Sequence, residues 1–252
     1  MGPVNTMGQD SLERAVREAG IEVPPVWFDE VGSTNEEARR LAREGAPEWT
    51  VVAAGHQTAG RGRLGRSWSD APGKSLLLSV LLRPGLRPPD APVLGFLAAV
   101  AMIAATDTKD LRSKWPNDLV IGGRKAGGIL TEAAIQGGRL LYVVVGLGVN
   151  VALAEADLPR SLRSTATSLF VDPGELLTGF LKGLIRGSQR SVREIVADYR
   201  EVCATLGRHV SATARSGRVI EGTAVDVDRR GLVLLSEGRK EVIRSDEVIH
   251  LR

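Results

Sequence analysis

The sequence is poor in the residues that form disulfides, metal centres and reactive thiols. Its 252 residues include one cysteine, Cys203, and three histidines. A single cysteine excludes an internal disulfide and a cysteine-based metal cluster, and so few histidines disfavour a zinc site. Cys203 lies on the apolar side of a predicted helix, which is typical of a small buried residue rather than of a nucleophile.

Long apolar runs are also missing. The longest, residues 93–105, is shorter than the roughly 20 residues that are needed to cross a bilayer. The start of the chain, residues 1–9, lacks the charged segment and apolar core of a signal peptide. We therefore expect a cytoplasmic protein without a membrane partner.

Aromatic residues are few and positive charge is barely in excess. Four Trp, two Tyr and four Phe accompany 33 basic and 30 acidic residues. Nucleic-acid-binding surfaces usually combine a basic stripe with exposed aromatic side chains. A module that binds RNA or DNA through a basic loop is therefore the alternative of a different class, and the composition argues against it.

Glycine, by contrast, is abundant, with 29 residues, and it shapes one unusual segment over residues 60–68, Gly-Arg-Gly-Arg-Leu-Gly-Arg-Ser-Trp. Glycine lets the backbone approach a ligand closely, and arginine offers a permanent charge with forked donors for carboxylate or phosphate. This arginine loop (residues 60–68) suits closure over a small anionic molecule. A solvated basic loop would have the same composition.

Hydrophobic patterns predict many consecutive strands, with the helices grouped apart from them. That grouping favours an α+β fold with a mixed, mainly antiparallel sheet flanked by helices. The expected strands cover residues 26–31, 50–54, 74–82, 111–115, 119–121, 129–135 and 140–151, with a hairpin-like connection over 122–128. The expected helices cover residues 12–19, about 33–44, 93–108, 175–186 and 192–206.

Two helix starts carry cap residues. Ser11 is expected to cap the first helix, and a capping box of Ser33 with Glu36, or of Thr34 with Glu37, the second. The unpaired N–H groups of such a helix start can also bind a ligand oxygen.

The pattern changes at Gly207. Short strands over 209–212, 219–227, 232–235 and 241–244, separated by turns at 215–217, 229–231 and 237–238, predict a small β-barrel. We place a domain boundary near Leu206, which gives a larger domain over residues 1–206 and a small one over 207–252.

Three polar segments lie at the predicted strand ends, and their order resembles that of a known family. They are Ser33-Thr34-Asn35, the arginine loop, and Lys114-Trp115-Pro116-Asn117-Asp118. Together with Arg124-Lys125-Ala126-Gly127-Gly128-Ile129-Leu130 and Gly146-Leu147-Gly148-Val149-Asn150, they resemble the signatures of the biotin protein ligases. The resemblance covers about residues 26–252. It implies a class II synthetase-like catalytic domain that binds biotin and ATP, followed by an SH3-like C-terminal domain. The chain resembles the members that lack an N-terminal DNA-binding domain, so no DNA partner is expected.

The resemblance implies a two-step reaction. Biotin and ATP form biotinyl-5′-adenylate and pyrophosphate, and a lysine of the biotin carboxyl carrier domain of a carboxylase then takes the biotin. ATP and Mg²⁺ are the expected cofactors, with Mg²⁺ carried by the phosphates rather than by protein ligands. A monomer or a weak homodimer is expected, because the strand near Lys114 could pair edge to edge.

The resemblance also assigns roles to individual residues. The expected catalytic residues are Lys125, Arg61, Arg63 and Asp118. Biotin contacts are expected from Ser33, Thr34, Asn35, Gln57, Gly60, Arg61, Trp68, Lys125, Gly127 and Gly128. Nucleotide contacts are expected from Arg63, Arg66, Trp68, Lys114, Asn117, Asp118, Gly148 and Asn150.

Other interpretations of these residues stay open at this point. Lys125 could be a plain surface lysine, Asp118 a turn residue, and Trp68 a core tryptophan. The nearest alternative function is that of a lipoate–protein ligase or octanoyltransferase, which shares the fold but lacks the arginine loop and the Lys114–Asp118 signature.

Overall fold

A computed structural model describes residues 6–158, 160–213 and 218–244. Its centre is a seven-stranded sheet in the order β1-β2-β3-β7-β6-β5-β4. The pair β1–β2 is parallel and every other neighbouring pair is antiparallel. The strands are β1 (Val26–Val31), β2 (Val51–Gln57), β3 (Ser75–Leu82), β4 (Arg112–Lys114), β5 (Asp118–Ile121), β6 (Arg124–Gln136) and β7 (Arg139–Asn150).

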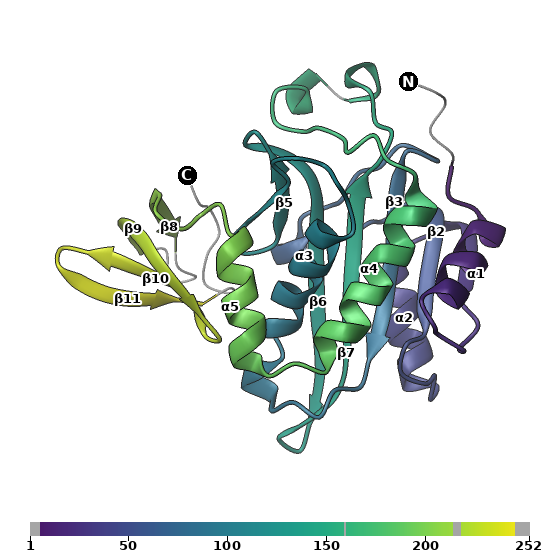
Figure 1. Ribbon diagram of the computed structural model, residues 1–252, viewed down its shortest axis with the longest axis horizontal. Coiled ribbons are helices and arrows are strands. Elements are labelled where there is room, and N and C mark those ends of the chain that lie inside the picture. Colours follow the sequence, from purple (N-terminus) through teal and green to yellow (C-terminus); the bar gives the residue numbers. More distant parts are fainter. Residues whose placement is uncertain (1–5, 159, 214–217, 245–252) are drawn as a thin grey trace.

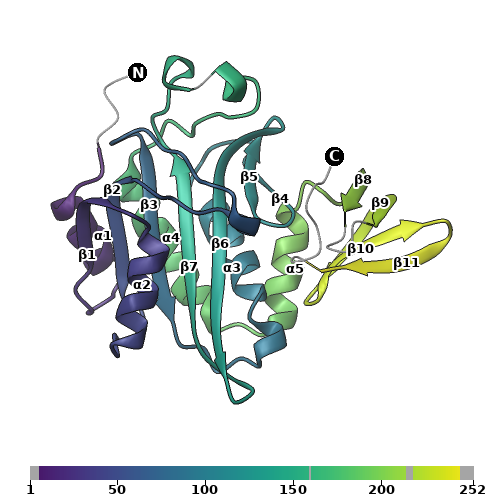
Figure 2. The same cartoon turned by 180° about the vertical axis from the view of Figure 1, so that it is seen from behind.

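Helices cover both faces of this sheet, so its central strands are buried on two sides (Figures 1 and 2). One face carries α1 (Gln9–Glu18), α3 (Val93–Ala104), α4 (Pro173–Ser188) and α5 (Val192–Val202). The other face carries α2 (Thr34–Arg43), which packs on β2, β3 and β7. Every residue of β3 is buried, including Ser75 and Ser79, so this strand lacks the alternation of a sheet with one face in water. The predicted α+β class is confirmed.

A second, four-stranded antiparallel sheet follows α5, in the order β11-β10-β9-β8. Its strands are β8 (His209–Thr213), β9 (Val219–Asp228), β10 (Gly231–Ser236) and β11 (Arg239–Ile243). Over the described residues, the small all-β unit that the sequence predicts is this four-stranded antiparallel meander. The expected turn at 215–217 lies outside the described residues.

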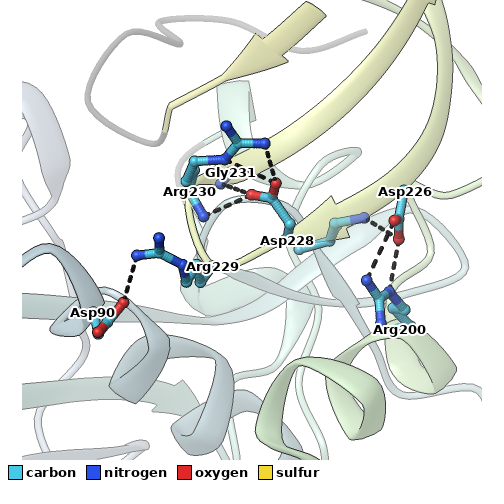
Figure 3. A network of polar contacts seen from close by, with 8 residues as sticks. Asp90, Arg200, Asp226, Asp228, Arg229, Arg230 and Gly231 are labelled. Carbon is cyan, nitrogen blue, oxygen red and sulfur yellow. Dashed lines mark hydrogen bonds and ion pairs between the residues drawn. The ribbon is translucent and has the colours of Figure 1, made fainter. Parts of the chain in front are cut away.

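The two sheets are joined by both packing and charge. Buried residues of the second sheet, such as Ala224 and Leu232, belong to the same hydrophobic cluster as those of the central sheet. Figure 3 shows Arg229, on the turn between β9 and β10, reaching Asp90 at 2.8 Å, while Arg200 of α5 binds Asp226 of β9 at 2.6 Å. The same turn is closed by the Asp228 carboxylate, which accepts backbone N–H groups from Arg230 and Gly231.

Several expected boundaries are wrong. The helix that begins at Val93 ends at Ala104 rather than at residue 108, and the last helix ends at Val202, which leaves Cys203 buried at its C-cap. The expected connection over 122–128 is only a turn at Gly122–Gly123, because β6 already begins at Arg124. Both glycines have positive φ, so the turn is made by these two residues alone.

The expected helix caps are wrong as well. The first helix has Gly8 as its N-cap, and the Ser11 hydroxyl accepts from the Gly8 N–H instead. Ser33 is the N-cap of α2, but its side chain makes no capping hydrogen bond. Glu36 binds Arg61 instead, at 2.9 Å, so a carboxylate that was expected to close the helix start holds the arginine loop.

Candidate active site

The three polar segments meet around one cavity of about 220 Å³ at the end of the central sheet. Five basic side chains and one acidic side chain line it. Its wall comprises the expected residues Ser33, Thr34, Asn35, Gln57, Arg61, Arg63, Arg66, Trp68, Lys114, Asn117, Asp118, Lys125, Gly128 and Gly148. Residues that lie more than 100 positions apart in the chain are therefore brought together, as the motif order predicts.

One corner of the cavity is a hydrogen-bonding group at the start of α2. Ser33 and Thr34 are 2 % and 3 % exposed. The Thr34 N–H, one of the unpaired groups of the helix start, donates to Gln57 Oε1 at 2.8 Å. Since Gln57 ends β2, this bond fixes the helix start against the strand end. The Ser33 hydroxyl is not used by the helix, which leaves it for the cavity.

Asn35, the third residue of this segment, is held by other side chains. It is 3 % exposed, and its Nδ2 donates to Glu132 Oε2 at 2.8 Å and to the Leu130 carbonyl at 3.3 Å. Its Oδ1 accepts from the Ser79 hydroxyl at 2.6 Å. The side chain fits because residue 146 is glycine: a Cβ there would lie 1.9 Å from Asn35 Oδ1.

The arginine loop folds back on itself. The Gly62 N–H donates to the Arg66 carbonyl at 2.7 Å, and the Trp68 N–H donates to the Gly60 carbonyl at 2.9 Å. Between them, Arg63–Gly65 form a single 3₁₀ turn. The loop thus leaves β2 and returns as a small hairpin over the cavity.

Trp68 lies flat against glycines of two strands. A Cβ at residue 148 would lie 2.7 Å from Trp68 Cε2, and one at residue 128 would lie 3.4 Å from Cζ3. The indole Nε1 is buried and has no hydrogen-bond partner among the described residues. Trp68 is therefore a cavity wall whose donor group is unused, rather than a tryptophan of the hydrophobic core.

Lys125 and Asp118 form a charged pair next to Trp68 in the same cavity. Lys125 Nζ lies 2.6 Å from Asp118 Oδ1 and 5.5 Å from the centre of the Trp68 ring. The facing strands β5 and β6 set this distance. The Lys125 backbone also binds the segment after β7, since its N–H donates to the Thr165 carbonyl and its carbonyl accepts from Thr167. These contacts position Lys125 as part of the cavity rather than as a plain surface residue.

Three residues that were expected at the site do not line the cavity. Gly60 and Gly127 pack behind it, against the Trp68 backbone and against β7 respectively. Asn150 is 5 % exposed, and its Nδ2 donates to the Thr167 carbonyl at 2.9 Å. It therefore holds the segment that borders Lys125, and its expected contact with the nucleotide stays a prediction.

The expected free edge at Lys114 is also partly covered. The Ala204 N–H donates to the Ser113 carbonyl at 2.8 Å, and Ser113 pairs with Cys203 in parallel. The segment after α5 thus occupies part of the strand edge that was expected to pair between two copies.

The other lining residues all lie inside the motifs recognised in the sequence. Apart from Gly146, which was expected to contact the nucleotide, they are mostly apolar or small and no role was predicted for them. They are Gly62, Leu64, Ser67, Trp115, Pro116, Ile129, Leu130, Gly146 and Leu147. Among the described residues, no three or more His, Cys, Asp and Glu side chains are grouped so that they could hold a metal ion. No helix in the described part of the chain has the length and apolarity needed to span a membrane.

Comparisons with known proteins agree with this geometry. Residues 28–150 match the Biotin/lipoate A/B protein ligase family, and residues 205–251 match the Biotin protein ligase C terminal domain. A biotin--[acetyl-CoA-carboxylase] ligase of Mycobacterium tuberculosis is 33 % identical over 267 residues, which cover 95 % of this chain and 96 % of the relative. The bifunctional ligase/repressor BirA of Bacillus subtilis is 33 % identical over 238 residues, which cover 88 % of this chain and 72 % of the relative.

Solved structures give the same result. The biotin protein ligase from Aquifex aeolicus in complex with biotin and ATP matches with a TM-score of 0.72 and 27 % identity, over 90 % of this chain and 98 % of that one. Similarity of this degree extends over both the central and the C-terminal sheet. The chain therefore belongs to the biotin protein ligase family.

Proposed function

We propose that this enzyme activates biotin with ATP to biotinyl-5′-adenylate and transfers the biotin to a lysine of a biotin carboxyl carrier domain. The observation that carries the proposal is the composition of the cavity. A neutral hydrogen-bonding corner at Thr34 and Gln57 lies within the same space as a cationic wall. Biotin has a neutral ureido ring at one end and a carboxylate at the other, and this division matches it.

The cationic wall suits the first chemical step. That step brings a carboxylate to the α-phosphate of ATP, so two anions must approach each other, and positive charge has to offset their repulsion. Arg61, Arg63, Arg66, Lys114 and Lys125 all line the cavity. In our proposal Lys125 contacts the biotin carboxylate and then the acyl-phosphate oxygens, while Arg61 and Arg63 hold the phosphates. Mg²⁺ bound together with ATP would supply further positive charge.

The second step needs a neutral amine. A lysine has an ordinary pKa of about 10.4, so the acceptor lysine must lose a proton before it attacks. Asp118 lines the same cavity and its carboxylate lies 2.6 Å from Lys125 Nζ. We propose that Asp118 orients the acceptor amine or accepts its proton.

The larger assignments rest on the family. We propose that residues 1–206 form the catalytic domain and residues 207–252 an SH3-like domain that assists it. The proposal has three further parts. A carboxylase supplies the acceptor domain, the enzyme is cytoplasmic, and it is a monomer or a weak homodimer.

ATP–pyrophosphate exchange tests the function, with biotin, lipoate and octanoate supplied separately. Exchange that depends on biotin alone is the expected result, because only biotin carries a ureido group for Thr34 and Gln57. Exchange with lipoate or octanoate instead would support the adenylation step but would show that the substrate is a different acid. Absence of exchange with any of the three acids would refute the proposed reaction.

A further inference from the structure

A row of buried and half-buried polar side chains leads away from the biotin corner on the α2 side of the sheet. It runs from Thr34 through Ser79 and Asn35 to Glu132, and Glu132 binds Arg39 at 3.2 Å. Ser79 is completely buried, and Thr34 and Asn35 are 3 % exposed. These residues come from α2, β3 and β6, and Figure 2 shows α2 lying on this face of the sheet.

Glu132, at the end of the row, determines which group donates and which accepts in each of these hydrogen bonds. A carboxylate and a backbone carbonyl can only accept. Asn35 faces both, Glu132 Oε2 at 2.8 Å and the Leu130 carbonyl at 3.3 Å, so its amide nitrogen must point toward them. Its oxygen, Oδ1, therefore points toward Ser79.

The next two hydroxyl groups follow from that orientation. Ser79 has one hydroxyl hydrogen, and Asn35 Oδ1 at 2.6 Å can only accept, so this hydrogen is used there. Ser79 Oγ can then only accept from Thr34, whose Oγ1 lies 2.8 Å away. The only other side-chain partner of Thr34 Oγ1 is Gln57 Oε1 at 3.2 Å in the described part of the chain, and an amide oxygen is also only an acceptor.

The single hydroxyl hydrogen of Thr34 is therefore donated inside the protein, either to Ser79 Oγ or to Gln57 Oε1. Toward the cavity, Thr34 Oγ1 presents lone pairs alone. We propose that Glu132, Asn35 and Ser79 act as positioning residues that make Thr34 an obligate acceptor, and that this polarity selects ligands with an N–H group at the biotin corner. The inference rests on the proposed function and names what sets its specificity.

Gly146 supports the same conclusion, because the row depends on it. A Cβ at residue 146 would lie 1.9 Å from Asn35 Oδ1 and 3.0 Å from Nδ2. The first glycine of the Gly-x-Gly segment thus makes room for Asn35, whereas the second, Gly148, makes room for Trp68. Two glycines that look like one nucleotide motif in the sequence have separate tasks on the same face of β7.

The test compares biotin with its cyclic carbonate analogue, in which ring oxygens replace both ureido N–H groups. The two molecules have nearly the same shape, but the carbonate offers only acceptors. A site built to bind an N–H should reject it strongly, because two acceptors would face each other. We expect the wild-type enzyme to bind biotin at least about 100-fold more tightly than the carbonate in calorimetric titrations.

Two variants distinguish the effect of hydrogen-bond direction at Thr34 from the effect of the negative charge of Glu132. In Ser79→Ala the Thr34 hydroxyl keeps only the longer contact to Gln57 Oε1, at 3.2 Å, and this oxygen already accepts the Thr34 N–H. The hydroxyl can then turn toward the ligand, so the biotin-to-carbonate ratio should fall about tenfold or more. In Glu132→Gln the amide oxygen can still accept from Asn35, so the ratio should stay within about twofold of the wild type. Thermal melting of both variants checks that they are folded.

The outcomes are distinct. An unchanged ratio in Ser79→Ala would overturn the inference while leaving biotin activation intact. An equal fall in both variants would show that the charge of Glu132, rather than its acceptor role, sets the preference, and would also overturn it. A wild-type enzyme that binds neither ligand and shows no biotin-dependent exchange would instead refute the proposed function.

Discussion

Replacing Gly148 by alanine should damage ligand binding far more than folding. The new Cβ would lie 2.7 Å from Trp68 Cε2 and 2.9 Å from Nε1, whereas ordinary contact begins at 3.4 Å. The indole would have to move by about 0.7 Å, the difference between 3.4 and 2.7 Å. Overpacking of this kind costs about 1–3 kcal/mol, which corresponds to a loss in affinity of about 5- to 150-fold if the indole must return to its place when biotin binds.

The cost should appear in binding because Trp68 is part of a loop that can move. The arginine loop folds on its own backbone hydrogen bonds, so the indole can lift away without opening the core. We therefore expect the free energy of unfolding of the variant to change by less than about 1 kcal/mol, while the Kd for biotin rises about tenfold or more.

Calorimetric titration with biotin and urea unfolding measure the two quantities separately. Gly85→Ala is the matched control, because Gly85 has nothing within 4 Å of its added Cβ and should leave both quantities unchanged. An unchanged Kd in Gly148→Ala would refute the assignment of Trp68 as a wall of the biotin site. A large loss of stability with no selective loss of binding would show that the indole belongs to the core.

Three further predictions concern catalysis and acid stability. Asp118→Asn should slow transfer from preformed biotinyl-adenylate to the carrier domain by about 100-fold and should affect adenylation less; transfer at the full rate in single-turnover experiments would exclude the proposed role of Asp118. Arg63→Gly should release the adenylate and label proteins indiscriminately, because the cation that we propose to hold the phosphate is lost; unchanged retention in a release assay would contradict this. Burial alone would raise the pKa of Asp90, but hydrogen bonds from Arg229 and Arg87 outweigh it and hold the pKa below its ordinary value of 3.8. Since the folded-state pKa is lowered, the stabilisation is present above the unfolded-state pKa and is lost as the pH falls through the folded-state pKa. Urea unfolding should therefore show Asp90→Asn to be less stable than the wild type at pH 7, with the difference shrinking below about pH 4; a difference independent of pH would show that the carboxylate charge does not matter.

The fold could be predicted wherever one physical signal dominated. The buried run over 75–82 and the turn at Gly137–Gly138 identify β3 and the β6–β7 hairpin, because burial and positive φ leave few alternatives. The helix end at Ala104 was missed because the residues that follow are neutral toward a helix, and no glycine or proline marks the stop.

The site was predictable as a set of motifs but not as a set of contacts. Sequence order placed Ser33, Lys125 and Trp68 together, and the structure brings them to one cavity. The pairing of Glu36 with Arg61 was missed because a Ser-x-x-Glu pattern at a helix start predicts a local capping box. Whether a carboxylate closes its own helix or reaches a loop depends on tertiary distance, which a single sequence does not contain.

Asn150 shows the same limit. A side chain that follows Gly-x-Gly suggests contact with a nucleotide, yet this one donates to the Thr167 carbonyl. Its partner lies 17 positions further along the chain, in a segment that carries no periodic pattern. Residues that support a site from behind have the same chemistry as residues that touch a ligand, and only the fold distinguishes them.

One hydrophobic cluster continues from the central sheet into the C-terminal sheet. The boundary near Leu206 is therefore visible as a change in the sequence pattern, but the packing of the two parts is continuous across it. The two parts share an interior, so their folding is thermodynamically coupled, and neither has a stability that is independent of the other. A substitution at Leu232 or Ala224, neither of which lines the cavity, would lower the population of enzyme with an intact active site. We therefore expect the small sheet to affect catalysis through the stability of the whole chain, in addition to any contact with substrate.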